Sequence, residues 1–128
     1  MRAFLIRFFI FISGGLTYGL IEILFRGFTH WSMLIASGLC CVLLHIISLA
    51  QSMRIWQKCV LGGAVITTVE FVAGAVLNIA LGLAVWDYSS QPLNFMGQIC
   101  PLFSAAWTAL SFPAVLIFQK TDRLLQGR

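Results

Sequence analysis

Charged side chains are scarce in this sequence. Only 9% of its 128 residues are charged, with four acidic residues against eight lysines and arginines. A soluble domain carries about 25% charged residues. Hydrophobic residues make up 60% of the chain and the mean hydropathy is +0.97. This amount of polar surface is too small to cover a globular domain in water. The composition therefore excludes a soluble domain and predicts an integral membrane protein.

The four cysteines lack the spacing of a disulfide framework or a metal cluster. Cys40 and Cys41 are adjacent within an apolar run, and Cys59 and Cys100 lie near the ends of other runs. The sequence contains no C-x-x-C pair and no Cys/His spacing typical of zinc sites. We expect the cysteines to be apolar packing residues and expect no cofactor. Whether a metal binds elsewhere is left open.

Four apolar runs are long enough to cross a bilayer, which requires about 20 helical residues. They cover residues 3–25, 31–53, 59–83 and 98–118. Because the runs are continuous rather than alternating, they favour helices over a barrel. The prediction is an all-α polytopic membrane protein with one transmembrane domain, 1–128, and a structured outer loop at 84–97. Similar segments, "YGLIEILFRG" and "TTVEFVAG", suggest two parallel helical-hairpin repeats, 1–55 and 56–128.

Lysines and arginines predict the topology. They gather at the N-terminus, in the turn before residue 59 and in the C-terminal tail, whereas the 84–97 loop has none. The positive-inside rule then places both termini in the cytoplasm and this loop outside, in a cell inner or plasma membrane. The net charge of +4 reflects this topology and requires no nucleic acid. The start, "MRAFLIRFFIFISGG", lacks an A-x-A-like cleavage site, so we expect an uncleaved first helix.

Two glutamates lie within the apolar runs. A charge at the bilayer centre costs at least ~2.5–3 kcal/mol, so such residues usually face protein or a water-filled cavity. Tyr18, Glu22 and Arg26 share one helix face, and Glu70 shares another with Asn78. If these two polar helix faces lie opposite one another, they form a carboxylate pocket for a proton, a cation or a cationic or lipid-like substrate. Alternatively, Glu22 and Arg26 form an intrahelical pair and Glu70 is protonated and bonded to a neighbour.

The segment "WDYSSQPLNFMGQIC", residues 86–100, concentrates polar and turn-forming residues. Asp87 and Ser89 favour caps or turns, Pro92 favours a turning backbone, and Pro101 suits a helix start. We expect this segment to fold back over the carboxylate pocket. The candidate substrate-binding residues are Tyr18, Glu22, Arg26, Glu70, Asn78, Trp86, Asp87, Tyr88, Asn94, Gln98 and Trp107.

The longer run "WDYSSQPLNFMGQICPLFSAAWTALS" resembles the signature of a known family. In the ABC-transporter type IV (CmpB-like permease) family of small membrane proteins, W-D-Y-S is followed by P-x-N-x-x-G-x-I and an apolar helix containing a tryptophan. The matching residues are Trp86, Asp87, Tyr88, Ser89, Pro92, Asn94, Gly97, Ile99 and Trp107. Glu22 and Glu70 also resemble family positions. The resemblance implies a transporter or transporter subunit. The sequence has no G-x-x-x-x-G-K-[ST] motif, so any ATP hydrolysis would come from another chain.

Two further functions stay open beside transport. One is a membrane-embedded enzyme that uses Glu22 and Glu70, or Asp87, as an acid/base pair on a lipid-like substrate. No Ser/His/Asp order or metal motif supports a defined reaction, so a protein without enzymatic activity is favoured. The other is a non-catalytic membrane accessory protein. The small size and the pair Gly15 and Gly19 predict a homo-oligomer or a complex with other membrane subunits, in contact with membrane lipids and not with nucleic acid.

Overall fold

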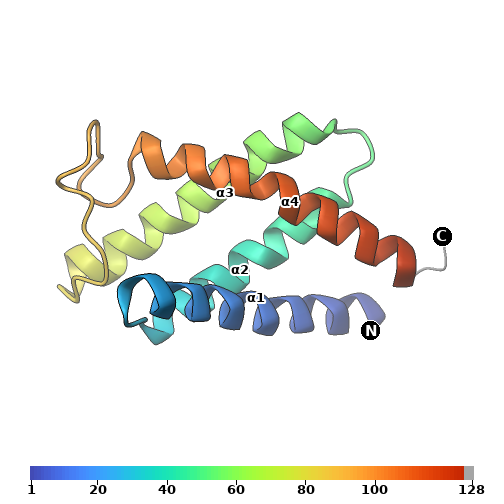
Figure 1. Cartoon of the computed structure of the whole chain (residues 1–128), viewed down its shortest axis with the longest axis horizontal. Coiled ribbons are helices and arrows are strands. Elements are labelled where there is room, and N and C mark those ends of the chain that lie inside the picture. Colours follow the sequence, from blue (N-terminus) through green and yellow to red (C-terminus); the bar gives the residue numbers. More distant parts are fainter. Residues whose placement is uncertain (126–128) are drawn as a thin grey trace. The chain divides into compact units, whose positions relative to one another are not determined.

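The computed structural model describes residues 1–125, and most of these residues are helical (Figure 1). The helices are α1 (Arg2–Arg26), α2 (Trp31–Ser48), α3 (Ile55–Gly74) and α4 (Pro101–Leu125), and a π-helical segment, η1 (Ala75–Ala80), continues α3. Four spans, namely α1, α2, α3 with η1, and α4, are long and apolar enough to cross a membrane. Within the described residues the only β-type pairing is an isolated bridge between Phe95 and Ile99. The predicted all-α fold with four transmembrane helices is confirmed.

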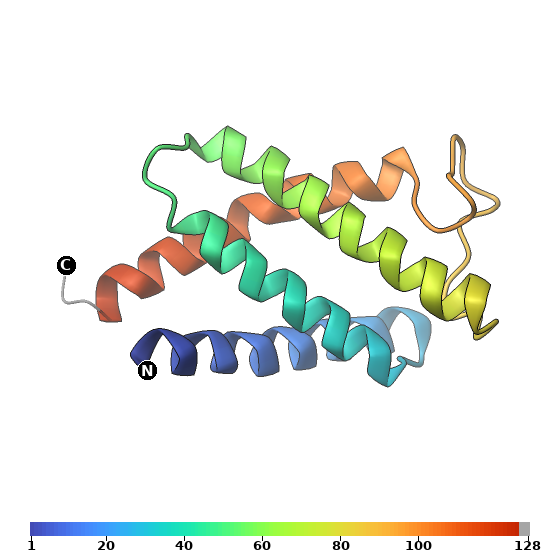
Figure 2. The same ribbon diagram turned by 180° about the vertical axis from the view of Figure 1, so that it is seen from behind.

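The chain forms two compact units, Met1–Leu43 and Leu44–Arg128. In the first, α1 and the beginning of α2 lie side by side, as both views show (Figure 2). A methyl group added at Gly15 would lie 2.5 Å from the carbonyl oxygen of Leu34, and one at Gly38 would lie 2.6 Å from the carbonyl oxygen of Phe11. The two backbones therefore approach closely because small residues line the contact.

In the second unit, α3 packs antiparallel against α4 (Figures 1 and 2). Gly62 faces Ser111, and Gly63 faces Thr108 so closely that neither glycine has room for a side chain. Ser111 and Val115 are fully buried. The predicted division into parallel hairpins, 1–55 and 56–128, stays a prediction.

The turn between α2 and α3 lies earlier in the sequence than the apolar runs indicate. Helix α2 ends at Ser48 rather than residue 53, and α3 begins at Ile55 rather than residue 59. The carbonyl oxygen of Ser48 accepts hydrogen bonds from Lys58 Nζ at 2.8 Å and Gln119 Nε2 at 3.3 Å. These side chains satisfy a carbonyl that the end of a helix leaves without an intrahelical partner.

Helix α4 starts at Pro101 and continues through Pro113 to Leu125, beyond the predicted end at residue 118. Its last turns bind the end of α2. Besides the Gln119 bond, Asp122 Oδ1 lies 3.8 Å from Nε2 of His45, and Phe118 packs edge-on to the His45 ring. These polar contacts keep residues helical that hydropathy alone assigns to a tail.

Candidate functional site

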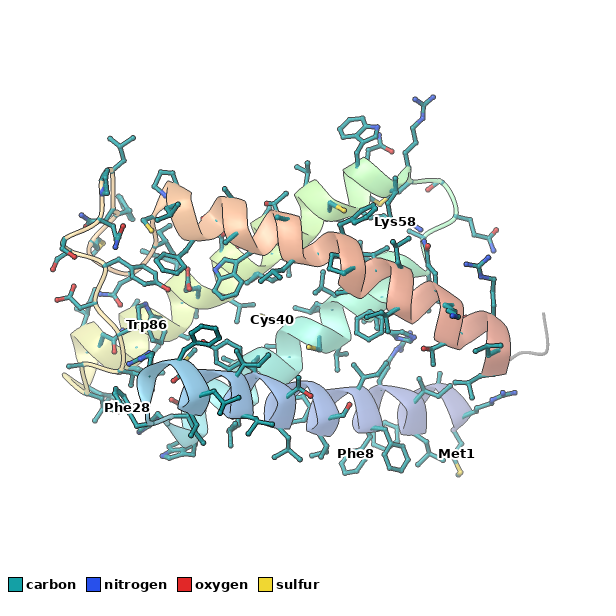
Figure 3. The ribbon with its side chains drawn as sticks, in the orientation of Figure 1. Met1, Phe8, Phe28, Cys40, Lys58 and Trp86 are labelled. Carbon is teal, nitrogen blue, oxygen red and sulfur yellow. The ribbon has the colours of Figure 1, made fainter. Side chains whose placement is uncertain are left out.

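Residues 81–100, here called the docking loop, connect η1 to α4 and fold back against the end of α3 (Figures 1 and 3). Tyr88 N–H donates to Gly97 O, and Phe95 N–H donates to Ile99 O, both at 2.8 Å. Trp86, labelled in Figure 3, is only 8% exposed and Gln98 only 5%. The segment predicted as a structured outer loop is thus an ordered hairpin-like turn with buried side chains.

A hydrogen-bond network attaches the docking loop to η1. Asn78 Nδ2 donates to Gln98 Oε1 at 2.8 Å, and Asn78 Oδ1 accepts from Val85 N–H at 2.7 Å. Trp86 Nε1 donates to Gln98 O at 3.1 Å. The bonds among Asn78, Val85, Trp86 and Gln98 form what we call the latch. Three predicted site residues meet in it, and they bind one another.

Two backbone features position the latch. A methyl group at Gly74 would lie 2.5 Å from Gln98 Oε1 and 3.0 Å from Cζ2 of Trp86, so only glycine lets the loop approach α3 here. From Ala75 the helix widens to π geometry, and Leu81 N–H bonds to Val76 O, five residues back. This wider turn ends the helical span and presents the amide of Asn78 to Val85 and Gln98, near the two ends of the docking loop.

Asp87 and Asn94 shape the docking loop itself. Asp87 Oδ1 accepts from Ser89 N–H at 2.8 Å, and this bond lowers the pKa of the exposed carboxyl group. Asn94 Nδ2 donates to the carbonyl oxygens of Ser89 and Gln91, while its Oδ1 accepts from Gly97 N–H at 3.0 Å. Both residues were predicted to bind substrate, but here their side chains bind the loop backbone.

Glu70 lies beneath this loop, on α3. Its Oε2 accepts a hydrogen bond from the Tyr88 hydroxyl at 3.0 Å. The indole of Trp107 also interacts with the carboxyl group, but it does not reach hydrogen-bonding geometry. Trp107 Nε1 and Glu70 Oε1 are therefore both buried without a hydrogen-bond partner.

Three neighbouring aromatic rings extend from this carboxyl group, and two of them are stacked. Tyr88 lies parallel to Phe103, with ring centroids 4.7 Å apart and planes at 4°, and Phe103 lies 6.5 Å from Trp107. We call Glu70, Tyr88, Phe103 and Trp107 the aromatic carboxylate site. Phe103 was not predicted, although its position four residues before Trp107 places both on one face of α4. Within residues 1–125 no three His, Cys, Asp or Glu side chains are grouped to hold a metal ion.

The other glutamate lies in the first unit. Glu22 is 5% exposed, and its Oε1 lies 3.6 Å from a guanidinium nitrogen of Arg26, one turn later. The Arg26 guanidinium also lies 4.6 Å from the centroid of the Phe28 ring. Tyr18 lies one turn before Glu22 and is half-buried. The intrahelical pair that the sequence offered as an alternative is therefore present, whereas a pocket shared by Glu22 and Glu70 stays a prediction.

Comparison with known proteins identifies a family for this chain. The family described as "Putative ABC-transporter type IV" matches residues 7–126, a range that includes both glutamates, the docking loop and Trp107. No curated protein and no solved structure matches the chain. The match covers nearly the whole length, and the four apolar helices identify a multi-pass membrane protein. The chain belongs to the ABC-transporter type IV family, as its W-D-Y-S segment predicted.

Proposed function

We propose that this protein is a membrane transporter or transporter subunit in which Glu70 binds a proton or a cationic group during transport. One observation carries the proposal: Oε1 of Glu70 is buried without a hydrogen-bond partner, within an apolar helix. Ionisable side chains inside membrane helices are costly and are usually found on substrate or ion pathways. A proton or a cation at Oε1 would satisfy this oxygen.

The bond between Tyr88 and Glu70 suits a group that gains and loses a proton. A tyrosine hydroxyl donates to an ionised carboxylate and accepts from a protonated one. The contact at 3.0 Å can therefore persist in both states. The bond to Tyr88 is therefore compatible with both protonation states of Glu70.

The charge of the carboxylate favours a cation over an anion. The faces of aromatic rings attract cations, but Tyr88 approaches Glu70 with its hydroxyl group and Trp107 with its indole N–H. A cation at Oε1 would therefore be held by the carboxylate charge and not by the ring faces.

The docking loop controls access in this proposal. Because Tyr88 belongs to the loop, release of the latch would remove its hydroxyl from Glu70 and open the site. We place the loop outside and both termini in the cytoplasm of the cell inner or plasma membrane, on the positive-inside rule. A homo-oligomer, or other membrane subunits with a separate ATPase chain, would complete the transporter.

Proteoliposomes test the proposal. Proton flux is followed with an enclosed pH dye, and uptake is measured for a panel of labelled cations. Glu70→Gln keeps the size and hydrogen-bonding capacity of the side chain but cannot ionise, so it should abolish flux. Asp87→Asn is the matched control, because it removes a carboxylate that is exposed and bonds to Ser89 within the same loop.

Flux through Glu70→Gln equal to that of the unmodified protein would refute a transport role for Glu70. A lipid product formed by the reconstituted protein, and lost in the same variant, would favour the membrane-embedded enzyme instead.

A further inference from the structure

We propose that a second site, at the opposite end of α3, binds an anionic phosphate group. A cavity of about 360 Å³ opens where the turn after α2, the start of α3 and the last turns of α4 meet. The polar residues that line it are Ser48, Gln51, Lys58, Gln119, Asp122 and Arg123. Figure 3 shows Lys58 at the opposite end of α3 from Trp86, so this cavity is separate from the aromatic carboxylate site.

Lys58 is the central feature of the cavity. The residue is only 5% exposed, and its ammonium group donates to the carbonyl oxygen of Ser48 at 2.8 Å. Across residues 1–125 no carboxylate forms an ion pair with Lys58. An ammonium group has three N–H donors, and a neutral carbonyl oxygen does not cancel its charge. A buried charge is costly unless it is paired, so this position favours an anion.

The other groups around the cavity are compatible with an anion. Arg123 is exposed and donates through Nε to Gln119 O at 3.4 Å, and its terminal guanidinium nitrogens provide further donors. The one acidic side chain, Asp122, lies 3.8 Å from Nε2 of His45. Two permanent cations therefore border the cavity with a single carboxylate. Charge-assisted bonds from ammonium and guanidinium groups are the strong contacts in phosphate recognition.

The location favours a phosphate at a membrane surface. Arg54 and Lys120 are exposed at this same end of the second unit, which the positive-inside rule assigns to the cytoplasm. The cytoplasmic leaflet is rich in anionic phospholipids, and basic pockets between helices bind their headgroups. A soluble phosphate or phosphate ester offers the same chemistry. The shared ligand is thus a phosphate group, and its source is decided by experiment.

The test uses the full chain in nanodiscs and two probes. In one arm, nanodiscs mix phosphatidylcholine with phosphatidylglycerol, and native mass spectrometry measures the anionic lipid retained by the protein. In the other, calorimetry measures the binding of inorganic phosphate to protein in phosphatidylcholine alone. Lys58→Gln removes the charge but keeps an N–H donor for Ser48. It should weaken binding about tenfold, the loss typical of a hydrogen bond to a charged group.

Lys120→Gln is the matched control, because it removes the same charge from an exposed position on α4. Retention of phosphatidylglycerol that is lost in Lys58→Gln and kept in Lys120→Gln assigns the site to a lipid headgroup. Phosphate binding with the same pattern in the second arm assigns it to a soluble phosphate. Equal effects of the two variants, or no binding in either arm, would overturn the proposal. If Lys58→Gln does not fold, Arg123→Gln replaces it as the site variant, because Arg123 also lines the cavity and is exposed. Its binding is then compared with that of Lys120→Gln.

Discussion

Replacing Gly74 by alanine should detach the docking loop from α3. The added methyl group would lie 2.5 Å from Gln98 Oε1 and 3.0 Å from both Gln98 Cβ and Trp86 Cζ2, so the loop must move. Overpacking of this kind costs about 1–3 kcal/mol, and the better helix propensity of alanine recovers up to about 1 kcal/mol. We expect a net weakening of loop docking by about 1–2 kcal/mol, which raises the open population about 5- to 30-fold.

Cys100 reports this opening without an engineered label site. It is the last residue of the docking loop and is 2% exposed. A membrane-impermeant maleimide should therefore modify it only when the loop opens, and mass spectrometry of its peptide separates it from the other three cysteines. We expect the labelling rate to rise in Gly74→Ala by the same 5- to 30-fold, if opening is fast relative to labelling.

Val76→Ile is the matched control for the added methyl group. Val76 lies on η1, close to Gly74 in sequence, but its side chain is 51% exposed. Cys100 in the Val76→Ile variant should be labelled at the same rate as in the unmodified protein. If Gly74→Ala also labels at that rate, the loop does not pack on Gly74 as described.

Three further perturbations test other contacts. Asn78→Ala removes two latch bonds, each worth about 1 kcal/mol, so the labelling rate should rise about tenfold or more; an unchanged rate would show that the latch does not hold the loop. Because the docked loop lowers the pKa of Asp87, the ionised carboxylate stabilises the docked loop at pH values above the ordinary pKa of 3.8. This stabilisation is lost as the pH falls through the lowered pKa. Pepsin should therefore cleave the loop faster as the pH drops below 3.8, and Asp87→Asn, which keeps the acceptor oxygen, should remove that acid dependence; the same pH profile in both proteins would contradict this role. Arg26→Gln leaves the buried Glu22 without its ion pair. It should lower the free energy of unfolding by about 1–2 kcal/mol, which is less than the loss for a fully buried pair because Arg26 is 36% exposed. Its unfolding midpoint in detergent should lie below that of Glu22→Gln, and the reverse order would contradict the pairing.

The sequence predicted the number and order of the helices, because run length and continuity determine which segments can span a membrane, but it did not predict where α2 and α4 end. It also predicted an ordered loop at 84–97, because Asp87, Pro92 and Asn94 have turn chemistry that acts over a few residues. The W-D-Y-S resemblance identified the family. These signals are all local in the sequence.

The latch and the aromatic carboxylate site could not be predicted in detail, because their contacts are long-range. Asn78 and Gln98 are 20 residues apart, and Thr67 and Ser104, whose hydroxyl groups bond at 2.9 Å between α3 and α4, are 37 apart. No residue pattern predicts the π geometry of η1, which directs the Asn78 side chain toward the loop. The carbonyl oxygen at the end of α2 likewise accepts a bond from Gln119, 71 residues beyond Ser48.

Infrared difference spectroscopy tests the role of Glu70 most directly. The chain has only four Asp and Glu residues, so few carboxyl groups contribute to the spectrum. Spectra of the protein in lipid are compared across pH 5–8, and with and without a transported or bound cation. We predict a carboxyl band that changes with proton or cation binding, is absent in Glu70→Gln, and persists in Asp87→Asn. A spectrum in which Glu70→Gln removes no responsive band, while the protein still transports, would contradict the account.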